Sequence, residues 1–296
     1  MINMDINRIT IRETVQPGSG ATAIDLLAMK TGLSKSRLKD AMNKGAVWVQ
    51  RGKKRSRLRR ATAALSAGDR IELYYDEEIL SLQPPSPMLI HDTRHYSVWN
   101  KPAGMLTQGT DYGDHCSLLR QAELAFGMKR EVFPVHRLDR EASGLVLIAH
   151  TKTAAAKLSD LFQKQQVQKI YRVVVRGIAG PPGSCRTIEI PLDSKPASSH
   201  YRVLSADAEA DTSTLVFRIE TGRLHQIRRH CAAIGHPVMG DPKHGSGNKN
   251  QEGMQLMAEM LTFRCPFAGR DVSYALKEGS KAISQRLRRL ANRELP

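Results

Sequence analysis

Apolar residues between positions 20 and 79 recur first at helical spacing and then in alternation. In "ATAIDLLAMKTG" (21–32) they lie three to four residues apart, which predicts a helix that ends at Gly32. Ser34 then precedes "KSRLKDAMNKG", where its hydroxyl can cap a second short helix that closes at Gly45. "AVWVQ" and "AGDRIELYY" have the composition and alternation of strands. We therefore predict a small module of two helices followed by strands.

The pattern changes after "LSLQPPSPMLIHD" (80–92), whose three prolines cannot continue a helix or occupy a central strand. We interpret this segment as a linker. Beyond it, strand-like runs alternate irregularly with helical stretches such as "KTAAAKLSDLFQKQQ" (152–166). This order predicts an α+β domain with a mainly antiparallel mixed sheet. The predicted domains are 1–79, with a core of about 20–79, and 93–296; the expected strands include "HYSVWN", "GLVLIAHT", "KIYRVVVRG" and "TLVFRIET".

One predicted helix carries a candidate functional residue beside its apolar stripe. In "GRLHQIRRHCAAIG" the residues Leu224, Ile227, Cys231 and Ile234 share one face of a helix that Gly235 ends. Arg228 lies beside this stripe, so its stem can follow the core while its guanidinium reaches a cleft. There it would hold a carboxylate bidentately and keep it ionised. Asp139, before the buried strand "GLVLIAHT", is the candidate; a structural ion pair and a catalytic acid both remain open.

The charge of the chain favours a polyanionic partner. Among 296 residues, 45 Lys and Arg stand against 29 Asp and Glu, a net charge of +16, and seven of the ten residues in "RGKKRSRLRR" are basic. No run approaches the roughly 18 apolar residues of a membrane span, and the start has no secretory signal pattern. The four cysteines form no C-x-x-C pair. We expect a cytoplasmic RNA-binding protein with no membrane or DNA partner.

Several classes of enzyme are disfavoured by their missing motifs. "HRLD" departs from the kinase H-R-D loop, and neither a Walker loop nor a G-x-S-x-G elbow is present. His225 and His230 are five residues apart, about 140° around a helix, unlike the i, i+4 pair of zinc helices. His236 and His244 follow with no metal-ligand spacing. We expect no metal and no cofactor.

Four stretches together resemble the RluA-type RNA pseudouridine synthases. They are "HYSVWNKPAGMLTQG", "HRLDREASGLVLIAHT", "KIYRVVVRG" and "TGRLHQIRRHCAAIGHPVMGDPKHG". His136 and Arg228 favour this branch over the RsuA-type branch, which has Gly and Lys there. The N-terminal "LSKSRLKDAMNKGAVWV" and "AGDRIEL" resemble the RNA-binding domain of ribosomal protein S-four, with a lengthened basic loop between them.

The resemblance implies a function and a role for each matching residue. Asp139 is the catalytic aspartate, Arg228 its basic partner, and Tyr171 the aromatic residue that stacks on the uracil and takes part in later proton transfer. Arg137 fills the place that the target uridine leaves. The remaining expected substrate contacts are His136, Arg223, His225 and Lys101, and the expected RNA contacts of the N-terminal domain are Lys35, Arg37, Lys39, Arg51, Lys53, Lys54 and Arg55.

The chemistry agrees with these residue types. Turning uridine into pseudouridine moves the ribose from ring nitrogen N1 to ring carbon C5, with no redox step, so a single ionised carboxylate can begin it. Ala142 stands where the family commonly has Thr. We expect a monomeric isomerase that acts on ribosomal or transfer RNA. The alternative is a non-catalytic RNA-binding protein with the same fold, which the presence of Asp139, Tyr171 and Arg228 disfavours.

Overall fold

The computed structural model describes residues 7–17 and 22–276, which form two compact units. The first unit contains residues up to 85 together with 108–127, and the second contains 86–107 and the chain from 128 onward. Residues 1–6, 18–21 and 277–296 of the two predicted domains lie outside the described part. Within that part, no helix is both long and apolar enough to cross a membrane.

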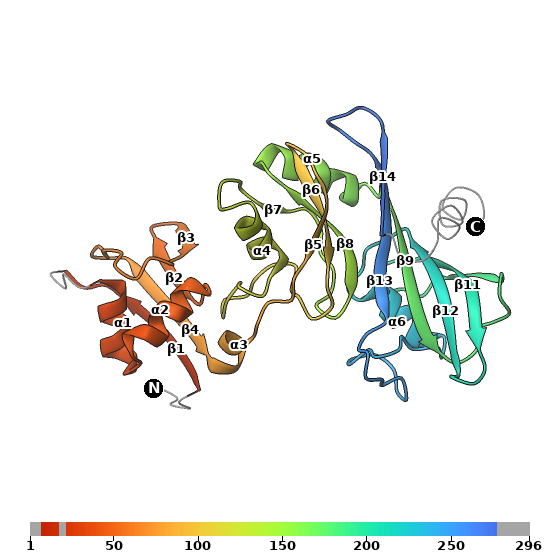
Figure 1. Cartoon of the computed structure of the whole chain (residues 1–296), viewed down its shortest axis with the longest axis horizontal. Helices are drawn as coiled ribbons and strands as arrows, with labels where there is room; N and C mark the ends of the chain where they lie inside the picture. Colours follow the sequence, from red (N-terminus) through yellow and green to blue (C-terminus); the bar gives the residue numbers. More distant parts are fainter. Residues whose placement is uncertain (1–6, 18–21, 277–296) are drawn as a thin grey trace. The chain divides into compact units, whose positions relative to one another are not determined.

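The N-terminal unit packs two helices against a sheet (Figure 1). Among the described residues the strand order is β1-β4-β2-β3, all antiparallel. As predicted, Gly32 ends the first helix in a left-handed conformation with φ of 71°, and the Ser34 hydroxyl accepts the N–H of Arg37 at the start of the second. The elements are β1 Arg8–Thr14, α1 Ala23–Thr31, α2 Lys35–Asn43, β2 Val47–Arg51, β3 Lys54–Arg57, β4 Arg70–Asp76, α3 Glu77–Ser81 and α4 Leu118–Ala125.

Ion pairs connect the segment 108–127 to the rest of this unit, which the sequence pattern did not predict. Asp111 pairs with Arg55 at 3.0 Å, and Asp114 pairs with Arg57 at 3.0 Å. The expected basic loop is also partly regular, because β3 pairs with β2 as a hairpin with its turn at Gly52 and Lys53. Acidic residues far along the chain thus neutralise part of the basic run.

The second unit is built on one mixed sheet, as the sequence predicted. Ten strands of the described chain form it, in the order β10-β11-β12-β9-β13-β8-β6-β5, with β14 on β13 and β7 on β8. All pairs are antiparallel except β13 with β8. The elements are β5 Met88–Asp92, β6 Tyr96–Lys101, β7 Phe133–Pro134, β8 Ser143–Ala149, α5 Lys152–Gln163, β9 Val167–Arg176, β10 Cys185–Ile188, β11 Ser199–Asp207, β12 Thr212–Ile219, α6 Gln226–Ala233, β13 Leu256–Arg264 and β14 Asp271–Ala275.

Part of the segment interpreted as a linker belongs to regular structure. Residues 77–81 form α3, and residues 88–92 form β5, which pairs with β6 at the edge of the sheet. The prolines at 84, 85 and 87 fall between these two elements, where their missing N–H groups are not needed by either. The three prolines therefore lie between α3 and β5, and the segment 80–92 is not irregular throughout.

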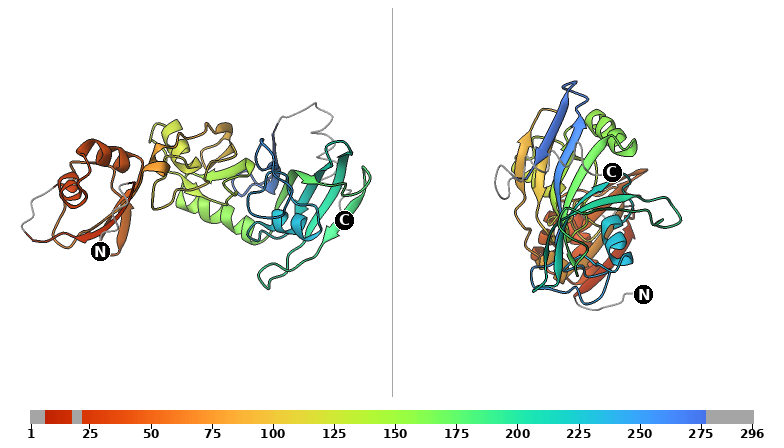
Figure 2. Two further views of the ribbon diagram at one scale, coloured as in Figure 1. Left: turned by 90° about the horizontal axis from the view of Figure 1, so that it is seen from below. Right: turned by 90° about the vertical axis from the view of Figure 1, so that its right-hand side faces the viewer.

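Two helices cover different parts of the sheet (Figures 1 and 2). Helix α5 packs its buried Leu158 against β8, and α6 packs Ile227 and Cys231 against β9 and β12. The predicted stripe of α6 is correct except at Leu224, which precedes the helix and is 66% exposed. The N-terminal end of α6 and the start of β8 consequently share one region of the second unit.

Gly144 lets two strands approach at that point. A Cβ added there would lie 2.3 Å from the carbonyl oxygen of Ala258, and its φ is 116°. Ala258 belongs to β13, which pairs in parallel with the beginning of β8. The glycine in "EASGLVLIAHT" therefore permits the close strand pairing that fixes the end of the Asp139 segment.

Gly144→Ala should lower the free energy of unfolding by about 2 kcal/mol or more, because the methyl group meets backbone that cannot move away. Urea unfolding measures the loss. Gly183→Ala is the matched control, since Gly183 also has a positive φ, of 92°, but no atom lies within 4 Å of the added Cβ. Equal losses in the two variants would show that close packing at Gly144 contributes nothing.

Candidate active site

A cavity of about 530 Å³, including the space at its mouth, opens in the second unit. Segments distant in sequence line it: the stretch before β8, strand β9, and the turn that leads into α6. Six residues predicted from the sequence meet there, namely Arg137, Asp139, Tyr171, Arg223, His225 and Arg228. The structure thus brings most of the predicted site together.

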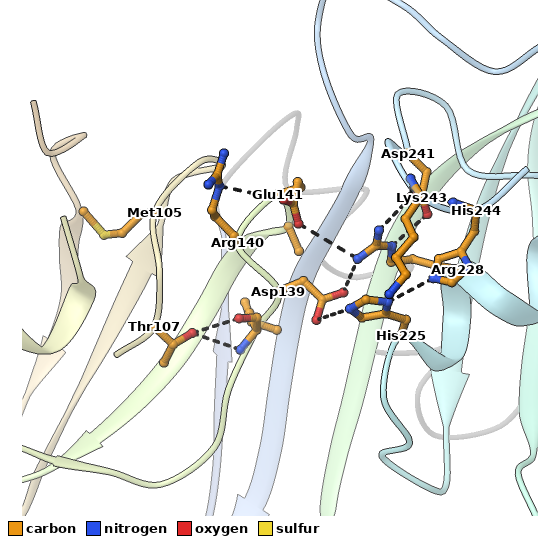
Figure 3. Close-up of polar contacts among 12 residues, drawn as sticks. Met105, Thr107, Asp139, Arg140, Glu141, His225, Arg228, Asp241, Lys243 and His244 are labelled. Atoms are coloured by element: carbon orange, nitrogen blue, oxygen red, sulfur yellow. Dashed lines mark hydrogen bonds and ion pairs between the residues drawn. The ribbon is translucent and has the colours of Figure 1, made fainter. Parts of the chain in front are cut away.

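Hydrogen bonds to the backbone on both sides of Asp139 hold its segment, and Figure 3 shows the two that Thr107 makes. The Thr107 hydroxyl donates to the Leu138 carbonyl at 2.9 Å and accepts the Leu138 N–H at 3.1 Å. The Gly104 N–H donates to the Arg140 carbonyl at 2.8 Å. These bonds lie on either side of Asp139, so the loop that carries the carboxylate has little freedom to move.

Arg228 connects Asp139 to a second carboxylate (Figure 3). Its Nη1 donates to Asp139 Oδ2 at 2.9 Å, whereas its Nε and Nη2 donate to the two oxygens of Asp241, each at 2.7 Å. The sequence predicted a bidentate hold on Asp139. The bidentate partner is instead Asp241, and Asp139 receives one N–H.

Burial and pairing decide the charges of this cluster. The side chain of Asp241 is fully buried and that of Arg228 is 2% exposed. Burial acts against both charges, but hydrogen bonds to Asp241 and Asp139 raise the pKa of Arg228 above its ordinary value. Burial likewise acts against the charge of Asp241, yet bonds from Arg228 and from the N–H groups of Lys243 and His244 lower its pKa. Both groups stay ionised, and Arg228 presents a fixed N–H to Asp139.

Several known proteins are similar to this chain. The family model of RNA pseudouridylate synthases matches residues 95–233. An uncharacterized RNA pseudouridine synthase of Aquifex aeolicus is 31% identical over 250 residues, which cover 76% of this chain and 78% of that protein. The dual-specificity RNA pseudouridine synthase RluA of Salmonella typhi is 30% identical over 210 residues, covering 65% of this chain and 93% of the relative.

The chain belongs to the RluA-type RNA pseudouridine synthase family. It is accordingly an isomerase that acts on RNA. A tRNA pseudouridine synthase C of Yersinia pestis is 34% identical over 192 residues, covering 55% of this chain and 72% of that protein. In fold, the structure of human RNA pseudouridylate synthase domain containing 1 covers 70% of this chain and 98% of its own, with a TM-score of 0.56 and 24% identity.

Lys101 lies away from the cavity of this synthase, which corrects the substrate contact predicted for it. Its side chain is fully buried, and Nζ lies 2.6–3.3 Å from the carbonyl oxygens of Pro102, Met105, Arg140 and Ala142. Burial lowers the pKa of Lys101 to about 8, although Glu141 and Asp139 act in the opposite direction. An ammonium group donating to carbonyls on both sides of Glu141 fixes the Asp139 segment from inside the protein.

His136, also predicted as a substrate contact, does not line the cavity, and its ring is bonded within the protein. Its Nε2 accepts the backbone N–H of Leu147 at 3.0 Å, and its ring stacks on Phe162 with centroids 4.3 Å apart. Burial lowers the pKa of His136 to about 3, so the ring is neutral and can accept that bond. It ties the start of the Asp139 segment to β8 and α5.

Arg137 and Tyr171 face the cavity with different environments. Arg137 is exposed and makes no hydrogen bond or ion pair within the part of the chain that the structure describes. Tyr171, on β9, is half-buried, and burial together with the charge of Asp139 raises its pKa. The phenol therefore stays protonated beside the carboxylate, while the guanidinium is free to reach outward.

The rim is formed by the turn before α6. Arg223 Nε donates to the Pro196 carbonyl at 3.1 Å, and Gln226, which is buried, accepts the Arg223 N–H at 3.0 Å.

Among the described residues no three His, Cys, Asp or Glu side chains converge as a metal-binding group. His230 is buried between Ser199 and the Ile190 carbonyl, and His236 contacts the Arg176 carbonyl.

The sequence pattern did not predict the roles of Asp241 and Thr107. Asp241 follows α6 by several residues in "GHPVMGDPKHG", where an acidic residue in a turn gives no periodic signal. The available clue was that a buried arginine needs more acceptors than one aspartate supplies. Thr107 lies near the end of "HYSVWNKPAGMLTQG", but its hydroxyl gains a role only because residue 138 folds next to it.

The predicted RNA contacts of the N-terminal unit divide into paired and unpaired cations. Arg51 pairs with Asp69 and Arg55 with Glu72 and Asp111, while Lys35 and Arg37 pair with Asp25 and Glu77. Lys39, Lys53 and Lys54 are exposed and have no carboxylate partner among the described residues. The guanidinium of Arg55 also lies 4.1 Å from the centre of the Trp48 ring.

Asp241→Asn should lower the free energy of unfolding by about 3 kcal/mol, because it leaves the charge of Arg228 buried without its bidentate partner. Urea unfolding measures the change. The matched control is Asp193→Asn, which breaks the bidentate but exposed pair of the neighbouring Arg229 and should cost less than about 1 kcal/mol. Equal losses would contradict the role given to Asp241.

Proposed function

We propose that Asp139 carries out the uridine isomerisation in this cavity. The observation that supports the proposal is its carboxylate, which lines the cavity and accepts a 2.9 Å hydrogen bond from the buried Arg228. An ionised carboxylate held in one place can begin to cleave the bond between ribose C1′ and uracil N1. The freed ring then turns and forms a new bond from C5 to the same C1′.

The uridine has to leave the base stack to reach Asp139. Extrusion costs a few kcal/mol, least in loops and single strands. Arg137, which is exposed and has no partner among the described residues, enters the place that the uridine vacates. The ring of Tyr171 gives the base a face to stack on. Arg223 at the rim contacts the backbone of the extruded nucleotide. No metal or cofactor takes part in this proposal.

Ribosomal or transfer RNA is the proposed substrate. The relatives include a protein named tRNA pseudouridine synthase C and one named dual-specificity RNA pseudouridine synthase RluA. The net charge of +16 supports a polyanionic substrate that contacts more than the cavity. A single chain carries the whole cavity, so we propose that the enzyme acts as a monomer.

The N-terminal unit is the proposed RNA-binding domain, related to that of ribosomal protein S-four. Its two helices and its β2–β3 hairpin carry the basic residues expected to contact phosphates. Lys39, Lys53 and Lys54 are the strongest candidates, since no carboxylate of the described residues pairs with their charges. The paired Arg51 and Arg55 contribute less, because binding phosphate would compete with Asp69, Glu72 and Asp111.

Asp139→Asn should abolish tritium release from RNA labelled at uridine C5 and leave RNA binding within about twofold, because only the reacting carboxylate is altered. Asp193→Asn, which changes an aspartate outside the cavity, is the control and should retain full release. Release by Asp139→Asn at the wild-type rate would refute the assignment. Absence of release by the wild-type enzyme on every RNA that it binds would favour the non-catalytic alternative.

Neutralising Lys53 and Lys54 to Gln should reduce the slope of log affinity against log salt by about 0.7 to 0.9 for each phosphate that these lysines neutralise. Filter binding at several salt concentrations measures the slope. Lys164→Gln, which removes the exposed lysine that follows α5 and pairs with Asp160, is the control. An unchanged slope in the double variant would remove the β2–β3 turn from the RNA-binding surface.

A further inference from the structure

The isomerisation ends with a proton transfer that needs an acceptor. When uracil C5 bonds to C1′, C5 carries both the new bond and its original hydrogen. The C5–H bond must then break, and its electron pair becomes the C5=C6 double bond. The electron pair of the C6=N1 bond passes to N1, which takes a proton from water. A base must receive the proton that leaves C5.

The position of Asp139 limits where this base can be. If Asp139 acts at C1′, as proposed above, C5 is one bond from C1′ at this stage, so the base must lie close to the carboxylate. The polar side chains lining the cavity are Arg137, Asp139, Tyr171, Arg223, His225, Gln226 and Arg228. The arginines stay protonated and an amide is not a base. Apart from Asp139 itself, the choice is between Tyr171 and His225.

His225 is placed and oriented for this task. Its Nε2 lies 3.9 Å from Asp139 Oδ1, and its side chain is 18% exposed in the cavity. Its Nδ1 lies 2.9 Å from Nε2 of His244, and the two rings meet edge to face (Figure 3). With Nδ1–H donating to His244, Nε2 keeps its lone pair toward the cavity. The 3.9 Å separation is too long for a hydrogen bond, so His225 Nε2 is not committed to Asp139.

We propose that His225 Nε2 accepts the C5 proton and that His244 orients the imidazole. The proton converts His225 into an imidazolium beside the carboxylate of Asp139, which stabilises the new charge. The imidazolium then gives the proton to water and the enzyme is reset. His244 acts through His225 and is a positioning residue.

The surrounding charges are compatible with a neutral His225 at the start. Burial has the largest effect and lowers its pKa below the ordinary value. The carboxylates of Asp139 and Asp241 act in the opposite direction, whereas the charges of Arg228 and Lys243 lower the pKa further. Tyr171 differs, because burial and Asp139 raise the pKa of its phenol, which makes it a poor proton acceptor near neutral pH.

The backbone offers a suitable variant for a test. His225 precedes α6 with φ of 52°, a left-handed conformation that Asn adopts readily. His225→Asn should lower kcat about 100-fold or more while changing KM little, which is the range expected for loss of a general base. The decisive readout is a primary isotope effect on kcat with RNA deuterated at uridine C5, which should be larger in His225→Asn than in wild type. Added imidazole should restore part of the rate.

Two matched variants decide between the candidates. Tyr171→Phe keeps the aromatic face and removes the phenol, so it should show no increase in the C5 isotope effect. His236→Asn changes a histidine that contacts the Arg176 carbonyl outside the cavity, and should behave as wild type. In wild type the rate should fall as pH drops through the pKa of His225, and this acid limb should vanish in His225→Asn.

An unchanged isotope effect in His225→Asn, or an increase in Tyr171→Phe alone, would overturn the proposal. If His225→Asn does not fold, His244→Phe is the alternative, because it keeps His225 and removes its orienting partner. It should show the same increase in the C5 isotope effect with a smaller loss of rate. An unchanged isotope effect in His244→Phe would also overturn the proposal. These results are distinct from the Asp139→Asn test, which decides whether the cavity is the active site.

Discussion

The site depends on how the guanidinium of Arg228 is divided between two carboxylates. Nε and Nη2 are committed to the buried Asp241, so Nη1 alone points to Asp139. A guanidinium has a rigid planar fork, and fixing one edge of it fixes the direction of the remaining N–H. Asp139 can then lie at the cavity, 25% exposed, while its partner is almost fully buried. The carboxylate at the cavity is accessible, and the charges that support it are not.

The Asp139 segment is restrained by polar contacts from several directions. Lys101 and Thr107, from β6 and the loop after it, bond to the backbone on both sides of Asp139. His136 ties the start of the segment to Leu147, and Gly144 allows the end of it to pass into a strand paired closely with β13. Such contacts restrict the position of Asp139, as the reaction proposed for it would require.

Asp241 also links the two flanks of Asp139. Its Oδ1 accepts the N–H groups of Lys243 and His244, at 2.8 and 3.1 Å, so it organises the turn that carries His244. His244 in turn contacts His225, whose other nitrogen faces Asp139. One buried carboxylate thereby supports the cation on one side of Asp139 and the imidazole pair on the other.

The sequence by itself determined the helices and strands that obey a period, and through them much of the site. The stripe of Ile227 and Cys231 predicted that Arg228 reaches a cleft, and the apolar run after Asp139 predicted a buried strand beneath it. The sequence could not predict hydrogen-bonding partners that lie in loops, because Asp241 and Thr107 follow no period. Lys101 and His136 look like substrate contacts in the sequence, because a pattern gives residue type but not direction. Only the tertiary structure decided that these two side chains point inward, where buried carbonyls and a backbone N–H needed partners, and that Asp241 takes the bidentate pair.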